Sequence, residues 1–383
     1  MNFDILIAGG GMAGQALALS LAHTQLKIGV IEFNDPNPVL DQQFHTRVSA
    51  ITPKSEQLLS EIGAWPYIVR KKAFVKTRVW DQNSHGHLDF DSSDQNLARL
   101  GHIIENDAIQ SALFQALEPT KVEFIQARFS HFDKQADGYA VHLDDGKQLS
   151  TKLLIGADGA RSKVRELAGI DYSEHDYEQQ AIVCNIQCEK SFEDTTWQRF
   201  LSDSIIALLP LGEHMASIVW SAKNPLASEL MSLDKSEFAD RLSQGVEYRF
   251  SRFEVISDIQ AFPLIERSSR SYVKENLALI GDAAHNIHPL AGQGINLGFA
   301  DVIELSAQIK ANIANFSDYS VLRKYARARR LDNELMAKTM TGLNWIYKEN
   351  SEPMRLLRGV GMNLVNEVPM LKSFFQKHAL GES

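Results

Sequence analysis

The first 32 residues contain the feature that most restricts how this 383-residue chain can fold. Apolar strands are expected over 3–8 and 27–31, with a helix over 15–22 between them and Glu32 after the second strand. Three glycines in a G-x-G-x-x-G pattern separate the first strand from the helix: Gly9, Gly11 and Gly14. Such glycines let a pyrophosphate approach a helix N-terminus, and the acidic residue can bind ribose hydroxyls. The pattern predicts a dinucleotide-binding unit on a parallel sheet.

Two later segments repeat the plan of a short apolar strand followed by a turn. Asp158 and Gly159 follow a strand that begins at Leu153, and Gly281-Asp282 ends a strand over 277–280. An aspartate in such a place can accept hydrogen bonds from sugar hydroxyls. The glycines that follow, at 292, 294 and 298, would let the backbone approach a flat ligand, and a helix beginning near 295 would direct its N-terminus at that ligand. The alternative is a strand–loop–helix connection with glycines for tight packing.

Together the three segments resemble those of the class A flavoprotein monooxygenases, which have the para-hydroxybenzoate hydroxylase-like fold. Within that class the chain is most similar to the ubiquinone-biosynthesis hydroxylases that act on polyprenylated phenols, and the likeness covers most of residues 3–330. Other segments that fit this family are 45–51, 105–110, 208–211, 219–221 and 262–264. The first fingerprint does not separate NAD from FAD, but the whole set implies FAD. The sequence has no second G-x-G-x-x-G, which argues against a separate nicotinamide domain.

The resemblance implies a set of cofactor-binding residues. They are Gly9, Gly11, Gly14, Glu32, Arg47, Gln110, Asp158, Asp282, Pro289, Gly292, Gly294, Ile295 and Asn296. In the family, the arginine that Arg47 matches lies near the dinucleotide phosphates, and the glutamine that Gln110 matches reaches the flavin. A surface arginine before a helix is the alternative for Arg47. No catalytic residue is assigned, and His285 and His288 are given no acid–base role.

The same resemblance implies FAD-dependent hydroxylation of an aromatic ring, on a polyprenylated phenol or quinol intermediate of ubiquinone biosynthesis. NADH or NADPH would reduce the flavin as a transient co-substrate, and O2 would add to form a flavin C4a-hydroperoxide that attacks the ring. Two alternatives stay open because the motifs describe flavin binding and not what reacts with the flavin. One is a reductase or oxidase that inserts no oxygen, and the other is a non-catalytic flavin-binding assembly subunit. A flavin halogenase would carry W-x-W-x-I-P, and none of the five tryptophans has that context.

The expected fold is α/β, with a Rossmann-like FAD-binding domain, an inserted antiparallel β-sheet substrate domain and a C-terminal helical tail. The FAD-binding domain is assigned to 1–75, 95–172 and 264–335, the substrate domain to 76–94 and 173–263, and the tail to 336–383. In the substrate region, alternation over 181–187, 205–211 and 215–220 predicts an antiparallel sheet, with one helix over 234–245. We expect Trp220 to lie in the core between sheet and helix.

Several local features carry narrower expectations. The segment 122–149 is predicted to be a meander of short strands, and a hairpin is predicted over 76–90. Gln25 stands where a glycine commonly closes the helix, which would cost about 1 kcal/mol if that residue were left-handed. Arg161 could hold a phosphate or pair with Glu166.

The sequence contains two pairs of residues that could be mistaken for metal ligands, and we predict a metal site at neither. His85 and His87 lie on a turn with no third ligand nearby in the sequence, so we expect them to face solvent. Cys184 and Cys188 are four residues apart on a predicted strand and point to one face, where a disulfide is geometrically poor. We therefore predict two reduced thiols.

Composition restricts the partners. A net charge of −9 and a pI near 5.8 argue against a general nucleic-acid binder. The chain enters a strand within three residues and has no apolar run of about 18 residues, which favours a cytoplasmic protein, at most peripheral on the inner membrane face. Over 353–380, four basic residues and one acidic residue give +3 among many apolar side chains. This segment could bind a membrane surface or other ubiquinone-biosynthesis proteins, pack on the core, or join a homo-oligomer interface.

Overall fold

The computed structural model describes residues 2–82, 86–286, 294–330 and 333. Its first layer is a mixed sheet whose central strands are parallel, with the order β18-β19-β11-β1-β2-β8. The strands are β1 (Asn2–Ala8), β2 (Ile28–Glu32), β8 (Glu123–Gln126), β9 (Phe129–Gln135), β10 (Gly138–Leu143), β11 (Gln148–Gly156), β18 (Val273–Lys274) and β19 (Leu277–Leu279). This sheet confirms the Rossmann-like part of the prediction.

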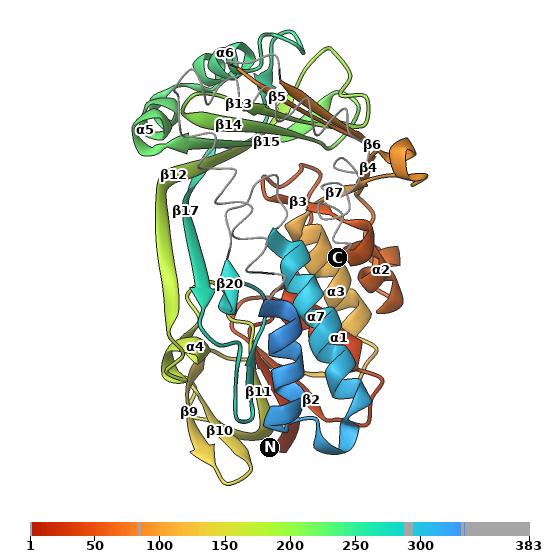
Figure 1. Ribbon diagram of the computed structural model, residues 1–383, viewed down its shortest axis with the longest axis vertical. Coiled ribbons are helices and arrows are strands. Elements are labelled where there is room, and N and C mark those ends of the chain that lie inside the picture. The colour runs from red at the N-terminus through yellow and green to blue at the C-terminus, as the bar shows by residue number, and fades with distance from the viewer. Residues whose placement is uncertain (1, 83–85, 287–293, 331–332, 334–383) are drawn as a thin grey trace.

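Helices cover one face of this sheet. They are α1 (Met12–Leu21), α3 (Asn106–Leu117) and α7 (Gly294–Ala311), and α1 packs against both of the others; Figure 1 shows α7 in front of this group. Every residue of α1 from Gly14 to Leu21 is buried, as expected for a helix enclosed between a sheet and other helices. After α7 the chain forms η5 (Ile313–Asn315) and then a helix over 319–330.

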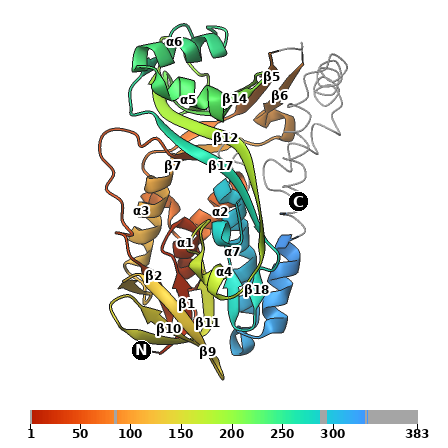
Figure 2. The ribbon, with the colours of Figure 1, turned by 90° about the vertical axis from the view of Figure 1, so that its left-hand side faces the viewer.

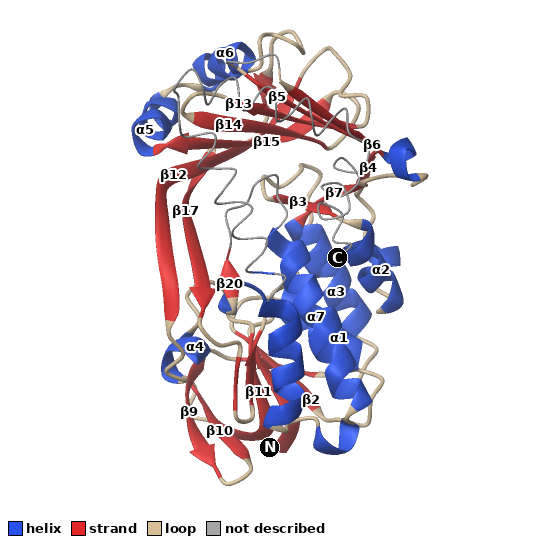
Figure 3. Ribbon diagram, viewed as in Figure 1, coloured by secondary structure: helices blue, strands red, loops and turns tan. Residues whose placement is uncertain are grey.

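A second, mostly antiparallel sheet forms the upper part of the molecule in Figure 3. Its strands, in spatial order, are β20 (His285–Asn286), β17 (Gln260–Ser269), β12 (Tyr172–Gln187), β15 (Met215–Lys223), β14 (Ser204–Pro210), β13 (Thr195–Phe200), β5 (Lys76–Asp81) and β6 (His87–Asp91), with β16 (Glu254–Val255) beside β12. The helices α5 (Asn224–Ser232) and α6 (Lys235–Gly245) pack on one face. The predicted hairpin over 76–90 is β5 and β6.

Two long strands connect the layers. β12 and β17 run between the upper and lower halves of the molecule, as Figure 2 shows from the side. At its far end β17 pairs with β20, which directly follows the Gly281-Asp282 turn. The antiparallel sheet therefore reaches the carboxyl edge of the parallel sheet.

A small third sheet lies between these layers, with the order β3 (Val48–Ile51), β7 (Gly101–Glu105), β4 (Lys72–Phe74). Its apolar residues Ala50, Phe74 and Ile103 pack against Leu209 and Leu211 of the large antiparallel sheet. The remaining short elements are α2 (Pro53–Glu61), η1 (Trp65–Tyr67), η2 (Ser92–Gln95), α4 (Lys163–Leu167) and η3 (Gly281–Ala283).

Three local predictions were wrong. β8 pairs in parallel with β2, so only β9, β10 and β11 form the meander expected over 122–149. The substrate region contains β13 and α5 in addition to the predicted elements. Gln25 does not have a positive φ, because α1 ends at Ala22 in a right-handed conformation, and the expected strain does not arise.

Other local predictions are confirmed. Trp220 is 3% exposed and packs against Phe238 of α6 in the core of the antiparallel sheet. Both cysteines are free thiols, and burial raises the pKa of Cys184 to about 12 and that of Cys188 to about 11. Within the part of the chain that the structure describes, no helix is long and apolar enough to cross a membrane.

Candidate functional site

The three predicted turns meet at one edge of the parallel sheet. β11 lies between β1 and β19, with Gly156 beside Ala8 on one side and Leu279 on the other. Backbone bonds extend this alignment past the strand ends, because Ala157 N donates to Ala8 O at 2.8 Å and Ile280 N donates to Gly156 O at 3.0 Å. Ligands of open α/β sheets bind outside the carboxyl ends of the strands, so this edge is the candidate site.

The glycines of the first turn have different roles. Gly9 has φ +109°, and a Cβ there would lie 2.3 Å from Ala157 O, while a Cβ on Gly14 would lie 2.0 Å from Gly9 O. These two glycines permit contacts within the protein. Around Gly11, no heavy atom of the described residues lies within 4 Å of a Cβ position, and among those residues no side chain caps the N-terminus of α1 there. The start of α1 therefore faces open space, where its N–H groups can bind an anion.

Glu32 lies beside this turn, as the fingerprint predicts. Its Oε2 accepts a hydrogen bond from Gly10 N at 2.8 Å, and its Oε1 accepts one from Asn34 N at 2.9 Å. Gln15 Nε2 donates to Gly10 O at 2.7 Å, and Gln110 Nε2 lies 3.4 Å from Pro36 O in the following loop. The structure thus brings Gln110 to the loop that follows Glu32.

Asp158 has a structural task that the sequence analysis missed. Its carboxylate accepts hydrogen bonds from Lys163 N at 2.7 Å, from Val164 N at 3.0 Å and from the Ser162 hydroxyl, at the start of α4. Burial raises the pKa of Asp158, and these bonds oppose that shift. The side chain fixes the turn that follows β11. In the sequence, Ser162 is a typical N-cap residue and indicates that a helix begins here, next to Asp158.

Asp282 and Arg47, far apart in sequence, lie near enough to interact electrostatically. The Asp282 side chain is exposed, yet desolvation by the surrounding protein raises its pKa, while His285 and Arg47 act in the opposite direction. Arg47 is also exposed, and its guanidinium carbon lies 5.6 Å from the ring centre of Phe262 on β17. Both groups are therefore open to a ligand.

The N-terminus of α7 is fixed by Asn296. Asn296 Oδ1 accepts from Ser55 Oγ at 2.7 Å and from Thr52 N at 3.2 Å, and its Nδ2 donates to Ala50 O at 2.8 Å. These bonds fasten the first turn of α7, with Gly294 and Ile295, to the segment joining β3 and α2. Pro289, Gly292 and His288 lie outside the described residues.

One face of the antiparallel sheet lies against the loop that carries Arg47. Asn185 Nδ2 donates to Phe44 O at 2.6 Å and Ser217 Oγ donates to Thr46 O at 3.3 Å, which places this face against the loop that carries Arg47. By strand register the same face contains only apolar or neutral side chains on the central parts of β12, β14 and β15: Ala181, Val183, Asn185, Ile205, Ala207, Leu209, Ser217, Val219 and Ser221. Such a surface suits an uncharged, apolar ligand.

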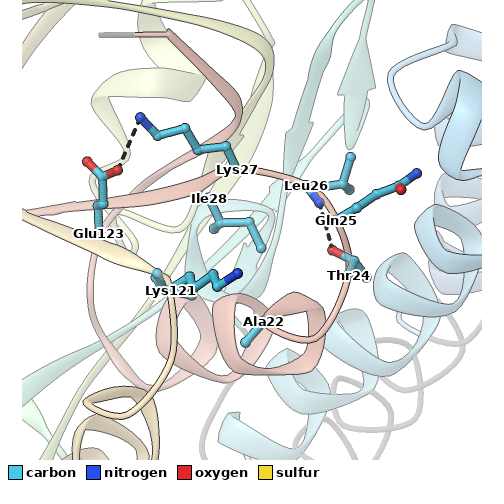
Figure 4. A pocket seen from close by; sticks show the side chains of 9 residues that line it. Ala22, Thr24, Gln25, Leu26, Lys27, Ile28, Lys121 and Glu123 are labelled. Carbon is cyan, nitrogen blue, oxygen red and sulfur yellow. Dashed lines mark hydrogen bonds and ion pairs between the residues drawn. The ribbon is translucent and has the colours of Figure 1, made fainter.

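Other recesses and polar groups lie elsewhere. The recess in Figure 4 is lined by Lys27, Glu123 and neighbouring residues at the amino ends of β2 and β8, away from the three turns. His131, Asp133 and His142 gather on the β9–β10 hairpin, where His142 Nε2 already lies 3.0 Å from Asp133 Oδ2. Arg161 is exposed, and in the described part of the chain it forms no ion pair with Glu166.

Known proteins match almost the whole chain. The FAD binding domain family matches residues 2–339. The chain is 35% identical over 386 residues to the 3-demethoxyubiquinol 3-hydroxylase of Escherichia coli (strain K12), covering 99% of this chain and 98% of that protein. It is 34% identical over 427 residues to the mitochondrial ubiquinone biosynthesis monooxygenase COQ6 of Homo sapiens, covering 97% and 91%. PqsL of Pseudomonas aeruginosa has the same fold, with a TM-score of 0.80 at 21% identity over 95% of this chain and 100% of that chain.

Proposed function

Because the chain belongs to the FAD-dependent aromatic monooxygenases, and within them to the ubiquinone-biosynthesis hydroxylases, we propose that it hydroxylates a polyprenylated phenol or quinol intermediate of ubiquinone biosynthesis. NAD(P)H and O2 are its co-substrates. The observation that supports this substrate class is a neutral, largely apolar sheet face that lies against the loop carrying Arg47. A charged substrate would lose its hydration there without gaining a partner.

The residues at the sheet edge fit FAD. The uncapped start of α1 at Gly11 would bind the pyrophosphate, and the Glu32 carboxylate would accept a hydrogen bond from a ribose hydroxyl. The exposed guanidinium of Arg47 would bind phosphate, and the Asp282 carboxylate would accept a hydrogen bond from a hydroxyl of the ribityl chain. When bound, FAD supplies the redox chemistry that activates O2.

The protein contributes orientation and exclusion of water. The N-terminus of α7, fixed by Asn296, would place the positive end of the helix dipole toward negative charge on the cofactor. The neutral face of β12, β14 and β15 holds the aromatic ring and keeps bulk water away from it. We assign Gly9, Gly14 and Asp158 to shaping the turns, and Gln110 to supporting the loop after Glu32.

The domain boundaries are part of the proposal. Residues 1–75, 95–172 and 264–335 form the FAD-binding domain, and 76–94 with 173–263 form the substrate domain. The basic, apolar segment 336–383 provides contact with a membrane surface, where a prenylated substrate resides. Co-sedimentation with anionic vesicles tests this contact: the full chain should bind and a chain ending at 335 should not. Equal binding by both chains would contradict it.

The direct test is NAD(P)H consumption in air with and without a short-chain prenylphenol, followed by mass analysis of the product. We expect consumption to be stimulated by the phenol and the product to gain one oxygen atom. Consumption that yields only hydrogen peroxide would indicate an oxidase. Flavin binding with no consumption across a series of phenols and quinols would indicate a non-catalytic flavoprotein.

A further inference from the structure

A single buried carboxylate connects three parts of the chain behind the Gly281-Asp282 turn. Asp301 of α7 is fully buried, and its Oδ2 accepts a hydrogen bond from Gly281 N at 2.9 Å. The same oxygen lies 2.7 Å from His285 Nε2, and Oδ1 accepts from Arg329 Nε at 2.8 Å. His285 and Arg329 are also buried. The carboxylate therefore contacts both ends of the segment that carries Asp282.

An ionised carboxylate in this environment needs its partners. Burial alone would raise the pKa of Asp301, but His285 and Arg329 bring that pKa below its ordinary value. Loss of either partner shifts the balance toward the neutral acid, which is a weaker acceptor for a backbone N–H. The ability of Asp301 to hold Gly281 thus depends on His285 and Arg329 together.

The helix over 319–330 reaches the same turn at a second point. Tyr325 is fully buried, and its hydroxyl donates to Leu279 O at 2.7 Å, at the end of β19. Arg329, one helical turn later, also donates from Nη2 to Asn333 Oδ1 at 2.8 Å. Figures 1 and 2 show this helix, in blue, beside α7. The helix over 319–330, which carries none of the predicted FAD ligands, therefore holds Leu279 directly and reaches Gly281 through Asp301 of α7.

We propose that Asp301 and Arg329 are positioning residues of the cofactor site: the carboxylate of Asp301 orients the Gly281-Asp282 turn toward FAD, and Arg329 keeps that carboxylate charged. This inference rests on the proposed role of Asp282 in binding FAD. It assigns a function in cofactor binding to a pair of buried residues.

The test compares Asp301→Asn, Arg329→Gln and the double variant with Arg327→Gln. Arg327 is an exposed arginine on the same helix, two residues before Arg329, and serves as the matched control. FAD dissociation constants are measured by flavin fluorescence on the apoprotein. Each single variant should weaken FAD binding roughly ten- to hundredfold, because a charge-assisted hydrogen bond is lost. The double variant should lose less than the product of the two single losses.

A pH series separates positioning from general structural damage. The titratable or charged groups around Asp301 are His285 from β20, Arg329 and Tyr325 from the helix, and Asp282 from η3. Arg329→Gln should raise the pKa of Asp301, because the guanidinium no longer favours the ionised form. In this variant FAD affinity should therefore rise as pH increases through that pKa, since only the ionised carboxylate holds the turn well. Arg329→Lys restores the charge and should recover part of the affinity and remove this pH dependence.

Hydrogen exchange of the apoprotein gives a readout without cofactor. The peptide 277–286 should exchange faster in Asp301→Asn and Arg329→Gln, and at the normal rate in Arg327→Gln. The proposal would be overturned if Asp301→Asn and Arg329→Gln lowered the melting temperature but changed neither FAD affinity nor the exchange rate of this peptide. If the unsubstituted protein bound no FAD, the proposed function would fail, whereas the exchange result would still test the control of the turn.

Discussion

The two turns at the sheet edge, Gly9 to Gly14 and Gly281-Asp282, are both assigned to FAD binding, but different contacts hold them in place. In the first, glycines at fixed spacing make the close contacts, because any side chain on Gly9 or Gly14 would meet backbone atoms. In the second, the turn is held from outside by Asp301 on α7, 20 residues later in the chain. Local spacing specifies the first turn, whereas long-range packing specifies the second.

Substitutions in the first turn should have the strongest effect on stability. Gly9→Ala should destabilise the apoprotein by about 3 kcal/mol or more, because a left-handed conformation and a contact with Ala157 O both oppose the methyl group. The free energy of unfolding in urea measures this. Gly11→Ala is the control: its methyl group points into open space, so stability should change by less than about 0.5 kcal/mol while FAD binding weakens. Equal destabilisation by both substitutions would contradict the assignment.

The start of α7 gives the next largest effect. Asn296→Ala removes four hydrogen bonds that fasten this helix to β3, Thr52 and α2, and should cost about 1–3 kcal/mol of stability. FAD binding should weaken as well, because the helix N-terminus shifts. Lys310→Ala, at the exposed far end of α7, should change neither quantity measurably.

Much of the first turn could be predicted from sequence, and much of the second could not. The strand, glycines, helix and Glu32 lie within 32 residues and each depends on local geometry. By contrast, the bond from Gly281 to Asp301, the cap made by Asp158 and the anchoring of Asn296 on Ser55 depend on contacts that no local pattern encodes. The missed helix α5 directly follows a strand, where alternation gives no warning of a change in period.

The second turn should also respond to pH. Asp282 has a raised pKa in the folded protein, so the folded state binds this proton more tightly than the unfolded chain. Its contribution to stability therefore declines as pH rises from its ordinary pKa through the raised value. Asp282→Asn should remove this decline and stabilise the apoprotein at neutral pH, by no more than about 1 kcal/mol because solvent screens the exposed group. FAD affinity should fall at least tenfold. A variant that lost stability and kept its FAD would contradict this role.

The opposite edge of the sheet should show the smallest effect. Lys27 and Glu123 form an ion pair of 3.1 Å between partly exposed side chains beside the recess in Figure 4. Lys27→Ala should lower stability by less than about 1 kcal/mol and leave FAD affinity unchanged. A clear change in FAD affinity would mean that the carboxyl edge is not the whole of the cofactor site.

The most direct test of the hydroxylase assignment is isotopic. The purified protein with FAD is supplied with NAD(P)H, a short-chain prenylphenol and ¹⁸O2, and the product is examined by mass spectrometry. The account predicts one ¹⁸O atom in the new ring hydroxyl. A product that contains oxygen only from water, or label found solely in hydrogen peroxide, would contradict it.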